Sequence, residues 1–219
     1  PVHYAGVGCE MDTILDVAQR HSLLVIEDAA QGIMSTYKGR ALGSIGDMGT
    51  LSFHETKIIV SGEGGALLLR DEVFSERAEM IREKGTNRRQ FLRGQVDKYT
   101  WCDIGSSYLP AEMTAAFLMA QIDEAEEITA KRMEKWDRYH AALSHIEEKG
   151  LARTPIVPQE CIHNAHMYYL LLPTHEKRTQ FIDFLRTREI SSVFHYIPLH
   201  SSPMGLKCSR SHGDLHHSE

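Results

Sequence analysis

The chain has 219 residues, enough to bury a sizeable core in one or two domains. Its hydrophobic content of 42% excludes a disordered chain, and its net charge of −6 disfavours nucleic acid as the main partner. No apolar run reaches the ~18 residues of a spanning helix, and no segment resembles a signal peptide, so we expect a cytoplasmic protein without a membrane partner.

The four cysteines lie far apart and form no Cys-x-x-Cys pair. This spacing argues against a zinc ribbon or a disulfide framework and favours a reducing compartment. Histidines are numerous near the end of the chain, yet none follows the His-Glu-x-x-His spacing. We therefore predict no metal site and interpret these histidines as surface or substrate-contact residues. They are His195, His200, His212, His216 and His217.

The first elements alternate between helix and strand. Apolar residues in Met11–His21 recur at helical spacing and predict a helix. Leu23–Ile26 is a continuous apolar run followed by Glu27 and Asp28, which predicts a buried parallel strand with an acid at its carboxyl end. A helix followed by an apolar strand is half of a βαβ unit, so we expect a mostly parallel sheet. Residues 32–47 are rich in glycine and predict a loop.

A single lysine lies between the next two predicted strands. Met48–Phe53 and Ala66–Leu69 are apolar runs bounded by glycine, and Lys57 falls in their connection. Ser52 precedes this lysine and Gly62-Glu63-Gly64-Gly65 follows it; short hydroxyl and glycine residues let a backbone approach a bound anion. A lysine above such a site can form a Schiff base when its amine loses a proton. The alternative is an ordinary solvated charge.

Asp28 and Lys57 together are the pair that pyridoxal phosphate needs. An aspartate keeps the pyridine nitrogen protonated, so that the ring can act as an electron sink, and a lysine carries the aldehyde carbon as an imine. Each residue alone has a simpler explanation, because an acid after a strand is often a helix cap. Their order, with Ser52 five residues before the lysine, favours the cofactor site.

A basic segment follows a predicted helix at Glu72–Lys84. Between Arg82 and Lys98 the positive charges far outnumber the negative ones, although the whole chain is acidic. Guanidinium groups such as those of Arg88 and Arg89 bind pairs of phosphate oxygens, so the segment predicts a clamp for a diphosphate. A solvated loop is the alternative.

The last part of the chain predicts one long helix and a smaller α/β unit. Ala111–Lys149 contains neither glycine nor proline, and its charged middle indicates a helix that crosses between domains in water. Its apolar stripe predicts core or dimer contacts. After Gly150 we expect strands at His166–Leu172 and Ser191–Ile197 around a helix at Glu176–Arg188, and then a polar tail without a further element.

Three segments resemble the sugar-nucleotide aminotransferases of the DegT/StrS type, and the resemblance covers essentially the whole chain. The resemblance implies an α/β protein with the fold type I of pyridoxal-phosphate-dependent transferases: part of a large, mostly parallel sheet domain plus a small C-terminal α/β domain. Residues 1–110 would be the C-terminal half of the large domain, 111–150 the connecting helix, and 151–219 an incomplete small domain. The three segments are Glu27-Asp28-Ala29-Ala30-Gln31, Ser52-Phe53-His54-Glu55-Thr56-Lys57 and Gly62-Glu63-Gly64-Gly65.

The resemblance also implies roles for particular residues. Lys57 would carry pyridoxal 5′-phosphate and move protons, and Asp28 would pair with the ring nitrogen. Cofactor contacts are implied for Gln31 near the ring, for Ser52 at the phosphate and for Ser107, where the family has an asparagine that reaches the partner subunit's cofactor. Substrate contacts are implied for Arg88, Arg89, His195 and His200; the alternative for the two histidines is the end of an edge strand.

The implied reaction moves an amino group from glutamate to a keto sugar of a nucleotide diphosphate sugar. The segments His54–Lys57 and Arg93–Trp101 are most similar to the branch of the family that makes dTDP-4-amino-4,6-dideoxygalactose, so dTDP-4-keto-6-deoxyglucose is the expected substrate. The product would serve cell-surface polysaccharides such as lipopolysaccharide or enterobacterial common antigen, and the enzyme would be a homodimer.

Two alternative functions remain open. One is a related pyridoxal-phosphate-dependent sugar dehydratase, but by resemblance that enzyme has histidine where Lys57 stands. The other is a non-catalytic module that binds the cofactor or a nucleotide. Relatives carry a long segment before the first residue of this chain, so we also expect a fragment that lacks the N-terminal part. These residues alone are then expected to hold pyridoxal phosphate poorly and to associate through exposed surfaces.

Overall fold

The computed structural model describes residues 1–215, so His216 and His217 lie outside the described residues. The chain divides into two compact units, Pro1–Leu171 and Leu172–Glu219. The predicted three-part division at residues 110 and 150 concerns a whole enzyme and stays a prediction. Among the described residues, no helix is long and apolar enough to cross a membrane.

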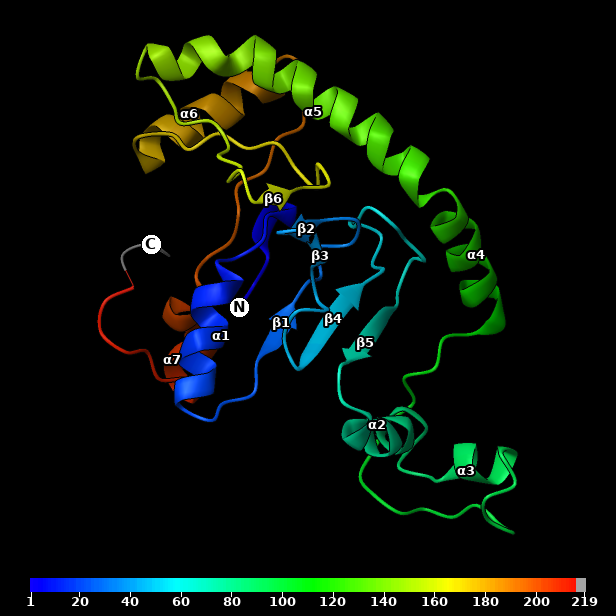
Figure 1. The fold of residues 1–219 in the computed structure, drawn as a ribbon. Coiled ribbons are helices and arrows are strands. Elements are labelled where there is room, and N and C mark those ends of the chain that lie inside the picture. Colours follow the sequence, from blue (N-terminus) through cyan, green and yellow to red (C-terminus); the bar gives the residue numbers. More distant parts are fainter. Residues whose placement is uncertain (216–219) are drawn as a thin grey trace. The chain divides into compact units, whose positions relative to one another are not determined.

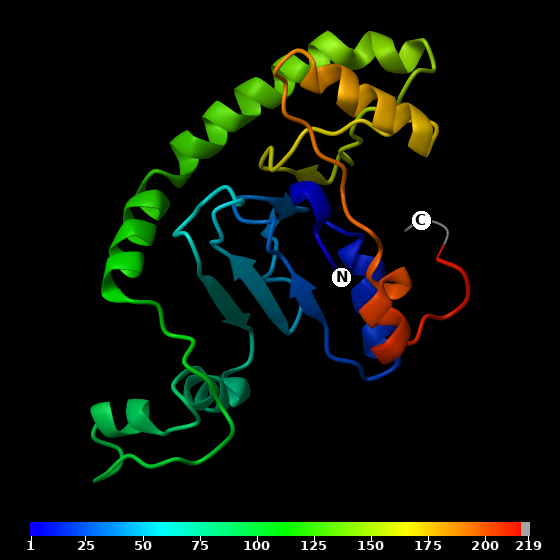
Figure 2. The ribbon, with the colours of Figure 1, turned by 180° about the vertical axis from the view of Figure 1, so that it is seen from behind.

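The first unit is built on a sheet of three strands, β1 (Ile26–Asp28), β4 (Met48–Ser52) and β5 (Gly65–Leu69). β4 lies between the other two, as Figure 1 shows, and Figure 2 shows the same order from behind. β4 runs parallel to β1, as predicted, but antiparallel to β5. The connection from β4 to β5 forms turns and no crossover helix, so the chain returns antiparallel to β4. The α/β class is therefore confirmed, whereas these strands form a mixed sheet.

Helix α1 (Met11–Arg20) confirms the helix predicted at the start of the chain. Met11 and Ala18 are buried in a hydrophobic cluster with Val25 and Ala29. The short 3₁₀ helix η1 (Tyr4–Gly6) precedes α1. These contacts place α1 on the side of β1 that carries Val25, since side chains alternate along a strand.

The strand predicted to be buried on both sides is covered on only one. Val25 is 5% exposed, whereas its neighbours Leu24 and Ile26 are 61% and 54% exposed. β1 begins at Ile26, the last residue of the predicted strand, and residues that alternate along the extended chain around it have opposite surroundings. A continuous apolar run is typical of a strand with both faces covered, but among the described residues nothing covers the second face.

A second small sheet occupies the segment predicted as a loop. Strands β2 (Thr36–Tyr37) and β3 (Arg40–Ala41) form a hairpin, and β6 (Cys161–Ile162) pairs with β2. Tyr37 is 1% exposed and joins the cluster under α1. This pairing ties the end of the first unit to its beginning, which local sequence patterns cannot reveal.

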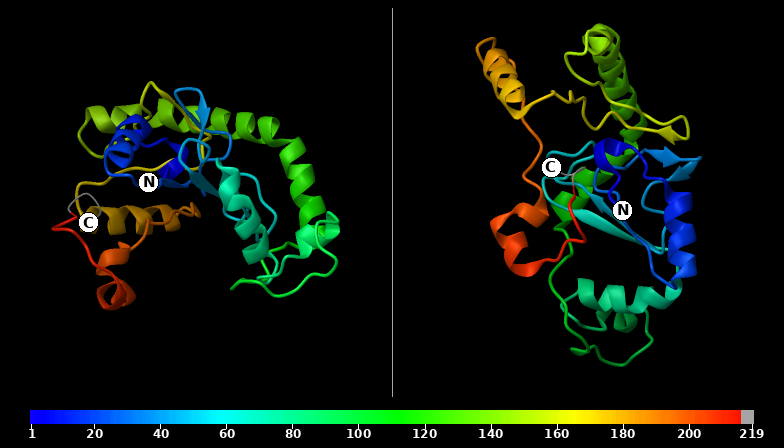
Figure 3. Two further views of the ribbon diagram at one scale, coloured as in Figure 1. Left: turned by 60° about the horizontal axis from the view of Figure 1, so that its bottom comes forward. Right: turned by 90° about the vertical axis from the view of Figure 1, so that its left-hand side faces the viewer.

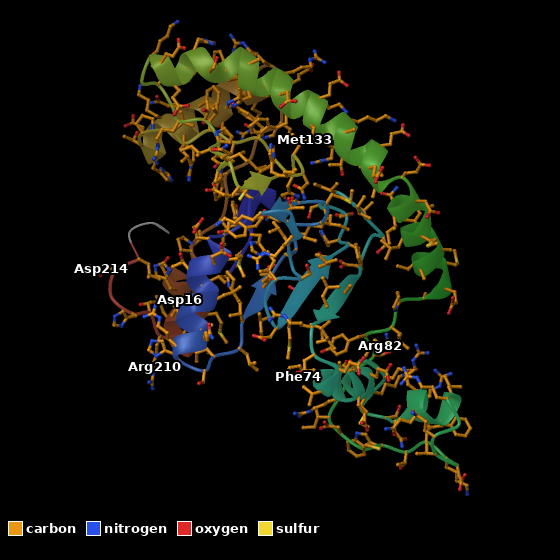
Figure 4. The ribbon with its side chains drawn as sticks, in the orientation of Figure 1. Asp16, Phe74, Arg82, Met133, Arg210 and Asp214 are labelled. Carbon is orange, nitrogen blue, oxygen red and sulfur yellow. The ribbon has the colours of Figure 1, made fainter. Side chains whose placement is uncertain are left out.

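A helical stretch follows β5, with η2 (Glu72–Phe74), α2 (Ser75–Arg82) and α3 (Arg88–Leu92). Figure 4 labels Phe74 at the start of this stretch and Arg82 at the end of α2. The helix predicted here is confirmed in its position. Val73 lies in the 3₁₀ turn that precedes α2 and is 71% exposed.

The long helix predicted after this stretch is two helices, α4 (Glu112–Asp123) and α5 (Ala125–Glu148). Figure 3 shows the bend between them. Glu124 at the junction has φ −101° and ψ 10°, outside the α-helical values. Met113 and Phe117 on α4 are 86% and 55% exposed, so the α4 part of the stripe is not core among the described residues, whereas Trp136 on α5 is buried. A dimer contact stays a prediction.

The second unit contains α6 (His175–Arg186), η3 (Leu199–Ser201) and α7 (Pro203–Cys208). The predicted helix is confirmed as α6, and α7 occupies the part predicted as a tail. Neither predicted strand forms among the described residues: Ser191–Ile197 joins no ladder, and Leu171 makes only an isolated bridge with Arg153. Alternating apolar residues indicate an extended backbone, but a strand also needs a partner, which lies far away in sequence.

Candidate active site

Asp28 and Ser52 lie on the same face of the β1–β4–β5 sheet. Asp28 is paired in register with Thr50, and Ser52 follows two residues later on β4. Side chains at paired and at alternate positions share a face, so both point to the side on which Ile26 is exposed. Since β1 and β4 are parallel, their carboxyl ends meet at one edge of the sheet. The structure thus brings these two predicted residues together.

Lys57 lies in the connection between β4 and β5, as predicted. Its backbone N–H donates to the carbonyl of His54 at 2.9 Å, and the next two residues, Ile58 and Ile59, are buried. Those isoleucines pack with Ala125 at the start of α5 in a second hydrophobic cluster. The loop is therefore anchored on its apolar side, and Lys57 is only half-buried. In the described part of the chain, no side-chain hydrogen bond or ion pair occupies its amine.

The glycines after Lys57 close this loop. The N–H of Phe53 donates to the carbonyl of Gly64 at 2.9 Å, and the N–H of Glu55 donates to Gly62 at the same distance. Gly64 has φ +154°, which residues with a side chain rarely adopt, and a Cβ there would lie 2.8 Å from the Ser61 hydroxyl oxygen. The glycines thus have a structural explanation in addition to the predicted approach of an anion.

Gln31 is tied to two distant segments. Its side-chain oxygen accepts the N–H of Ala5 at 2.6 Å, and its carbonyl accepts the side-chain amide of Asn164 at 2.8 Å. Asn164 is fully buried and also donates to the carbonyl of Ile33. These bonds fix the chain after Asp28. Sequence analysis did not identify Asn164, since a single asparagine in a predicted loop carries no signal of its distant partners.

Glu27, next to Asp28, has the opposite surroundings. It is fully buried, and it accepts hydrogen bonds from His3 Nε2 at 2.8 Å and from the backbone N–H groups of Gly43, Ile45 and Gly46 at 3.0, 2.6 and 2.5 Å. Burial by itself raises the pKa of a carboxyl, but these four donors hold the pKa of Glu27 below its ordinary value. Sequence analysis did not predict this structural role of Glu27. The signal for it was the alternation of side chains along a strand, which places Glu27 and Asp28 on opposite faces.

The basic segment is partly neutralised by its own neighbours. Arg88 on α3 forms an ion pair with Glu83 at 2.7 Å, and the Glu83 side chain is only 6% exposed. Arg93 binds both carboxylate oxygens of Glu79. Arg89 is exposed, and the described residues offer it no ion-pair partner. Of the two predicted phosphate ligands, Arg89 is therefore the one available to a ligand.

The other predicted residues lie elsewhere in the chain. Ser107 is exposed and forms an isolated antiparallel bridge with Glu83, in the segment between α3 and α4. His195 and His200 belong to the second unit, where His195 stacks on Tyr196 with ring centroids 4.8 Å apart and His200 lies in η3. Their predicted roles stay predictions. No group of three potential metal ligands occurs among residues 1–215.

The donor set on the open face suits pyridoxal phosphate. Asp28 offers a carboxylate for a protonated ring nitrogen, and Ser52 offers a hydroxyl for phosphate. Gly65 stands in register with Ser52, and a Cβ at this position would lie 2.8 Å from the carbonyl oxygen of Leu51. Lys57, in the loop beyond β4, offers the amine. The chemistry of these residues, and the face that Asp28 and Ser52 share, agree with the predicted cofactor.

Comparisons with known proteins give consistent results. GDP-perosamine synthase of Caulobacter vibrioides is 32% identical over 93% of this chain and 53% of the relative. dTDP-4-dehydro-2,3,6-trideoxy-D-glucose 4-aminotransferase of Saccharopolyspora spinosa is 29% identical over 93% of this chain and 53% of the relative. The crystal structure of DesV from S. venezuelae superposes with a TM-score of 0.83 at 27% identity, covering all of this chain and 55% of DesV. The chain thus spans about half the length of these proteins.

The family of these relatives is also the family whose model matches the chain. That model, the DegT/DnrJ/EryC1/StrS aminotransferase family, matches residues 1–219. Its members are pyridoxal-phosphate-dependent aminotransferases of fold type I, so the predicted family, fold class and family cofactor are confirmed. By its sequence, its fold and the residues on the open face of its sheet, this chain belongs to the DegT/DnrJ/EryC1/StrS aminotransferase family.

Proposed function

We propose that the protein is an aminotransferase that uses pyridoxal phosphate to convert a keto sugar of a nucleotide diphosphate sugar into an amino sugar. The observation that carries this proposal is the shared open face of Asp28 and Ser52, with Lys57 in the loop directly beyond the same strand. A non-catalytic binding module would not need a lysine with an unengaged amine at this place. A related dehydratase would, by the resemblance, have histidine at position 57.

The candidate site residues have separate tasks in this proposal. Pyridoxal phosphate, when bound, supplies a ring that accepts electrons from the reacting carbon. Asp28 holds a proton on the ring nitrogen, and Ser52 binds the phosphate. Lys57 Nζ holds the cofactor and then moves a proton as general base and acid, a contribution of roughly 10² to 10⁴ in rate. Gln31, with its side-chain oxygen bound to Ala5, presents a fixed amide near the ring.

The substrate proposed is a nucleotide diphosphate sugar, with dTDP-4-keto-6-deoxyglucose as the first candidate. One relative is named for a GDP sugar and the other for a dTDP sugar, so the family accommodates both nucleotides. Both names support a sugar-nucleotide substrate. Arg89 is proposed to bind the diphosphate, and His195 and His200 the sugar. Ser107 is proposed to contact the cofactor of a partner subunit.

We further propose glutamate as the amino donor, a homodimer as the active form and a product destined for cell-surface polysaccharide, made in the cytoplasm. The exposed apolar residues of α4, such as Met113 and Phe117, support a partner surface. A homodimer is consistent with the implied sharing of the site between subunits.

Reduction with borohydride tests the central assignment. The full-length protein is loaded with pyridoxal phosphate, reduced, digested and mapped by mass spectrometry. We expect the tag on Lys57, and a tag on another lysine would refute the site. A second assay supplies glutamate and a panel of dTDP- and GDP-linked keto sugars, and mass spectrometry identifies the aminated product. Absorbance that changes with glutamate but yields no aminated sugar would refute the proposed substrate class.

A further inference from the structure

The backbone of Asp28 is held from both sides. On one side, the N–H of Ala29 donates to the carbonyl of Thr50 on β4 at 3.0 Å. On the other, the N–H of Asp28 donates to the carbonyl of Pro1 at 2.8 Å, and the N–H of His3 donates to the carbonyl of Asp28 at 3.0 Å. The segment Pro1–His3 therefore acts as a neighbouring strand for this one residue.

The side chain of His3 anchors that segment. His3 is fully buried, and its Nε2 lies 2.8 Å from a carboxylate oxygen of Glu27. The backbone N–H of Cys9 donates to Nδ1 at 3.1 Å, which places a proton of the imidazole on Nε2, toward Glu27. The contact between Pro1–His3 and Asp28 thus depends on a hydrogen bond made on the opposite side of β1.

Glu27 in turn holds the turn at residues 43–46. Its two oxygens accept three backbone N–H groups of this turn. The turn lies directly on β4, because a Cβ at Gly49 would be 1.9 Å from the carbonyl oxygen of Gly43. The Glu27 carboxylate therefore connects three parts of the chain next to the backbone of Asp28: the segment Pro1–His3, the turn at residues 43–46 and β1.

We propose that His3 and Glu27 are positioning residues for Asp28: their buried hydrogen bond fixes the end of β1 so that the Asp28 carboxylate is directed at the ring nitrogen of the cofactor. This inference rests on the proposed function. Asp28 itself makes one local side-chain bond, to the N–H of Ala30 at 3.0 Å. The direction of its carboxylate therefore follows the backbone that the pair holds.

The directional bonds favour positioning over simple filling of the core. A buried carboxylate is costly to desolvate, and apolar residues of similar volume in place of buried polar partners often stabilise a fold as well or better. Hydrogen bonds to three amides and an imidazole, in contrast, fix orientation. The face that receives these bonds is closed to solvent, while the face of Asp28 is open, so the pair acts through the backbone alone.

Amide exchange in the full-length protein without cofactor tests the structural part. His3→Ala is compared with Met11→Ala, which removes a fully buried side chain of α1 and leaves the end of β1 untouched. The comparison is made at temperatures at which the two variants have lost the same amount of stability. Under these conditions we expect the backbone amide of Asp28 to exchange at least about tenfold faster in His3→Ala than in Met11→Ala. Equal exchange in the two variants would overturn the proposal.

Cofactor affinity tests the link to Asp28. We expect His3→Ala to weaken pyridoxal phosphate binding about tenfold in the wild-type background and less than about twofold in the Asp28→Asn background, because a positioning residue acts only through its target. His3→Gln, which keeps a donor toward Glu27, should restore part of the affinity. Equal losses in both backgrounds would overturn the proposal. If the wild type takes up no cofactor and Lys57 carries no tag, the proposed function fails, whereas amide exchange still decides the role of His3.

Discussion

Each face of the β1–β4–β5 sheet carries an acidic residue, and the two acids have opposite surroundings. Glu27 and Asp28 are neighbours in the chain, yet Glu27 is fully buried with four hydrogen-bond donors and Asp28 is exposed with one. A buried carboxylate is tolerated only when its charge is compensated within the protein. An exposed carboxylate remains available to a ligand. The comparison teaches that burial, and not residue type, separates the structural acid from the acid that is open to a ligand in this chain.

Replacing Lys57 should produce the largest effect on the open face. Lys57→Ala removes the covalent attachment and the proton carrier, so we expect amino transfer to fall by at least about 10² to 10⁴. Melting should change little, because the described residues leave the amine unengaged. Initial rates with glutamate and the keto sugar nucleotide measure the loss. Lys149→Ala, at the exposed end of α5, is the control and should be active. More than a tenth of the wild-type rate in Lys57→Ala would contradict the assignment.

Asp28→Asn should lower turnover and leave stability unchanged, unlike a change at the buried Glu27. The amide can still form a hydrogen bond but cannot compensate a protonated ring nitrogen, so turnover should fall by orders of magnitude while cofactor binding weakens modestly. The melting temperature should stay close to that of the wild type because Asp28 is exposed. Rates and spectral titration with pyridoxal phosphate give the two quantities. Normal turnover in Asp28→Asn would show that the electron-sink role is wrong.

Glu27→Gln should affect stability and its dependence on pH. The pKa of Glu27 is below its ordinary value of 4.5 in the folded protein, so its contribution is present above that value and is lost as the pH falls through the folded pKa. We expect the variant to lose about 1–3 kcal/mol at neutral pH and to show a flatter decline in acid. Urea unfolding between about pH 3 and 7 checks both expectations. Parallel declines in the two proteins would mean that Glu27 does not carry the acid sensitivity.

The two arginines of α3 also differ in whether they are bound within the protein or available to a ligand, and we expect smaller effects from replacing them. Arg88 is paired with the nearly buried Glu83, whereas Arg89 is exposed. Arg89→Ala should raise the KM for the nucleotide sugar about tenfold and spare that for glutamate, because it removes a charge-assisted bond to the diphosphate. Arg88→Ala should mainly lower stability, by about 1 kcal/mol or less.

Steady-state kinetics with each substrate, and thermal unfolding of both variants, distinguish these outcomes. The double variant should combine the two effects. Equal changes in the KM of glutamate and of the sugar nucleotide would argue against a diphosphate clamp in this segment.

Local sequence patterns predicted much of the first unit correctly. The helical spacing in α1, the acid at the end of β1 and the lysine between β4 and β5 all follow from short-range periodicity and turn residues. Errors arose where a partner was needed. The direction of β5, the pairing of β6 with β2 and the lack of a ladder at Ser191–Ile197 among the described residues depend on contacts beyond the local sequence.

The sequence by itself determined the functional groups that Asp28, Ser52 and Lys57 can offer to a ligand. Their side-chain types and their positions relative to the predicted strands depend only on short stretches of sequence. Only the tertiary structure decided which neighbouring acid is buried and which is open. That choice depends on His3, the turn at residues 43–46 and α1 converging on one face of β1. Compensation of a buried charge requires donors from several distant segments, and their positions exist only once the chain has folded.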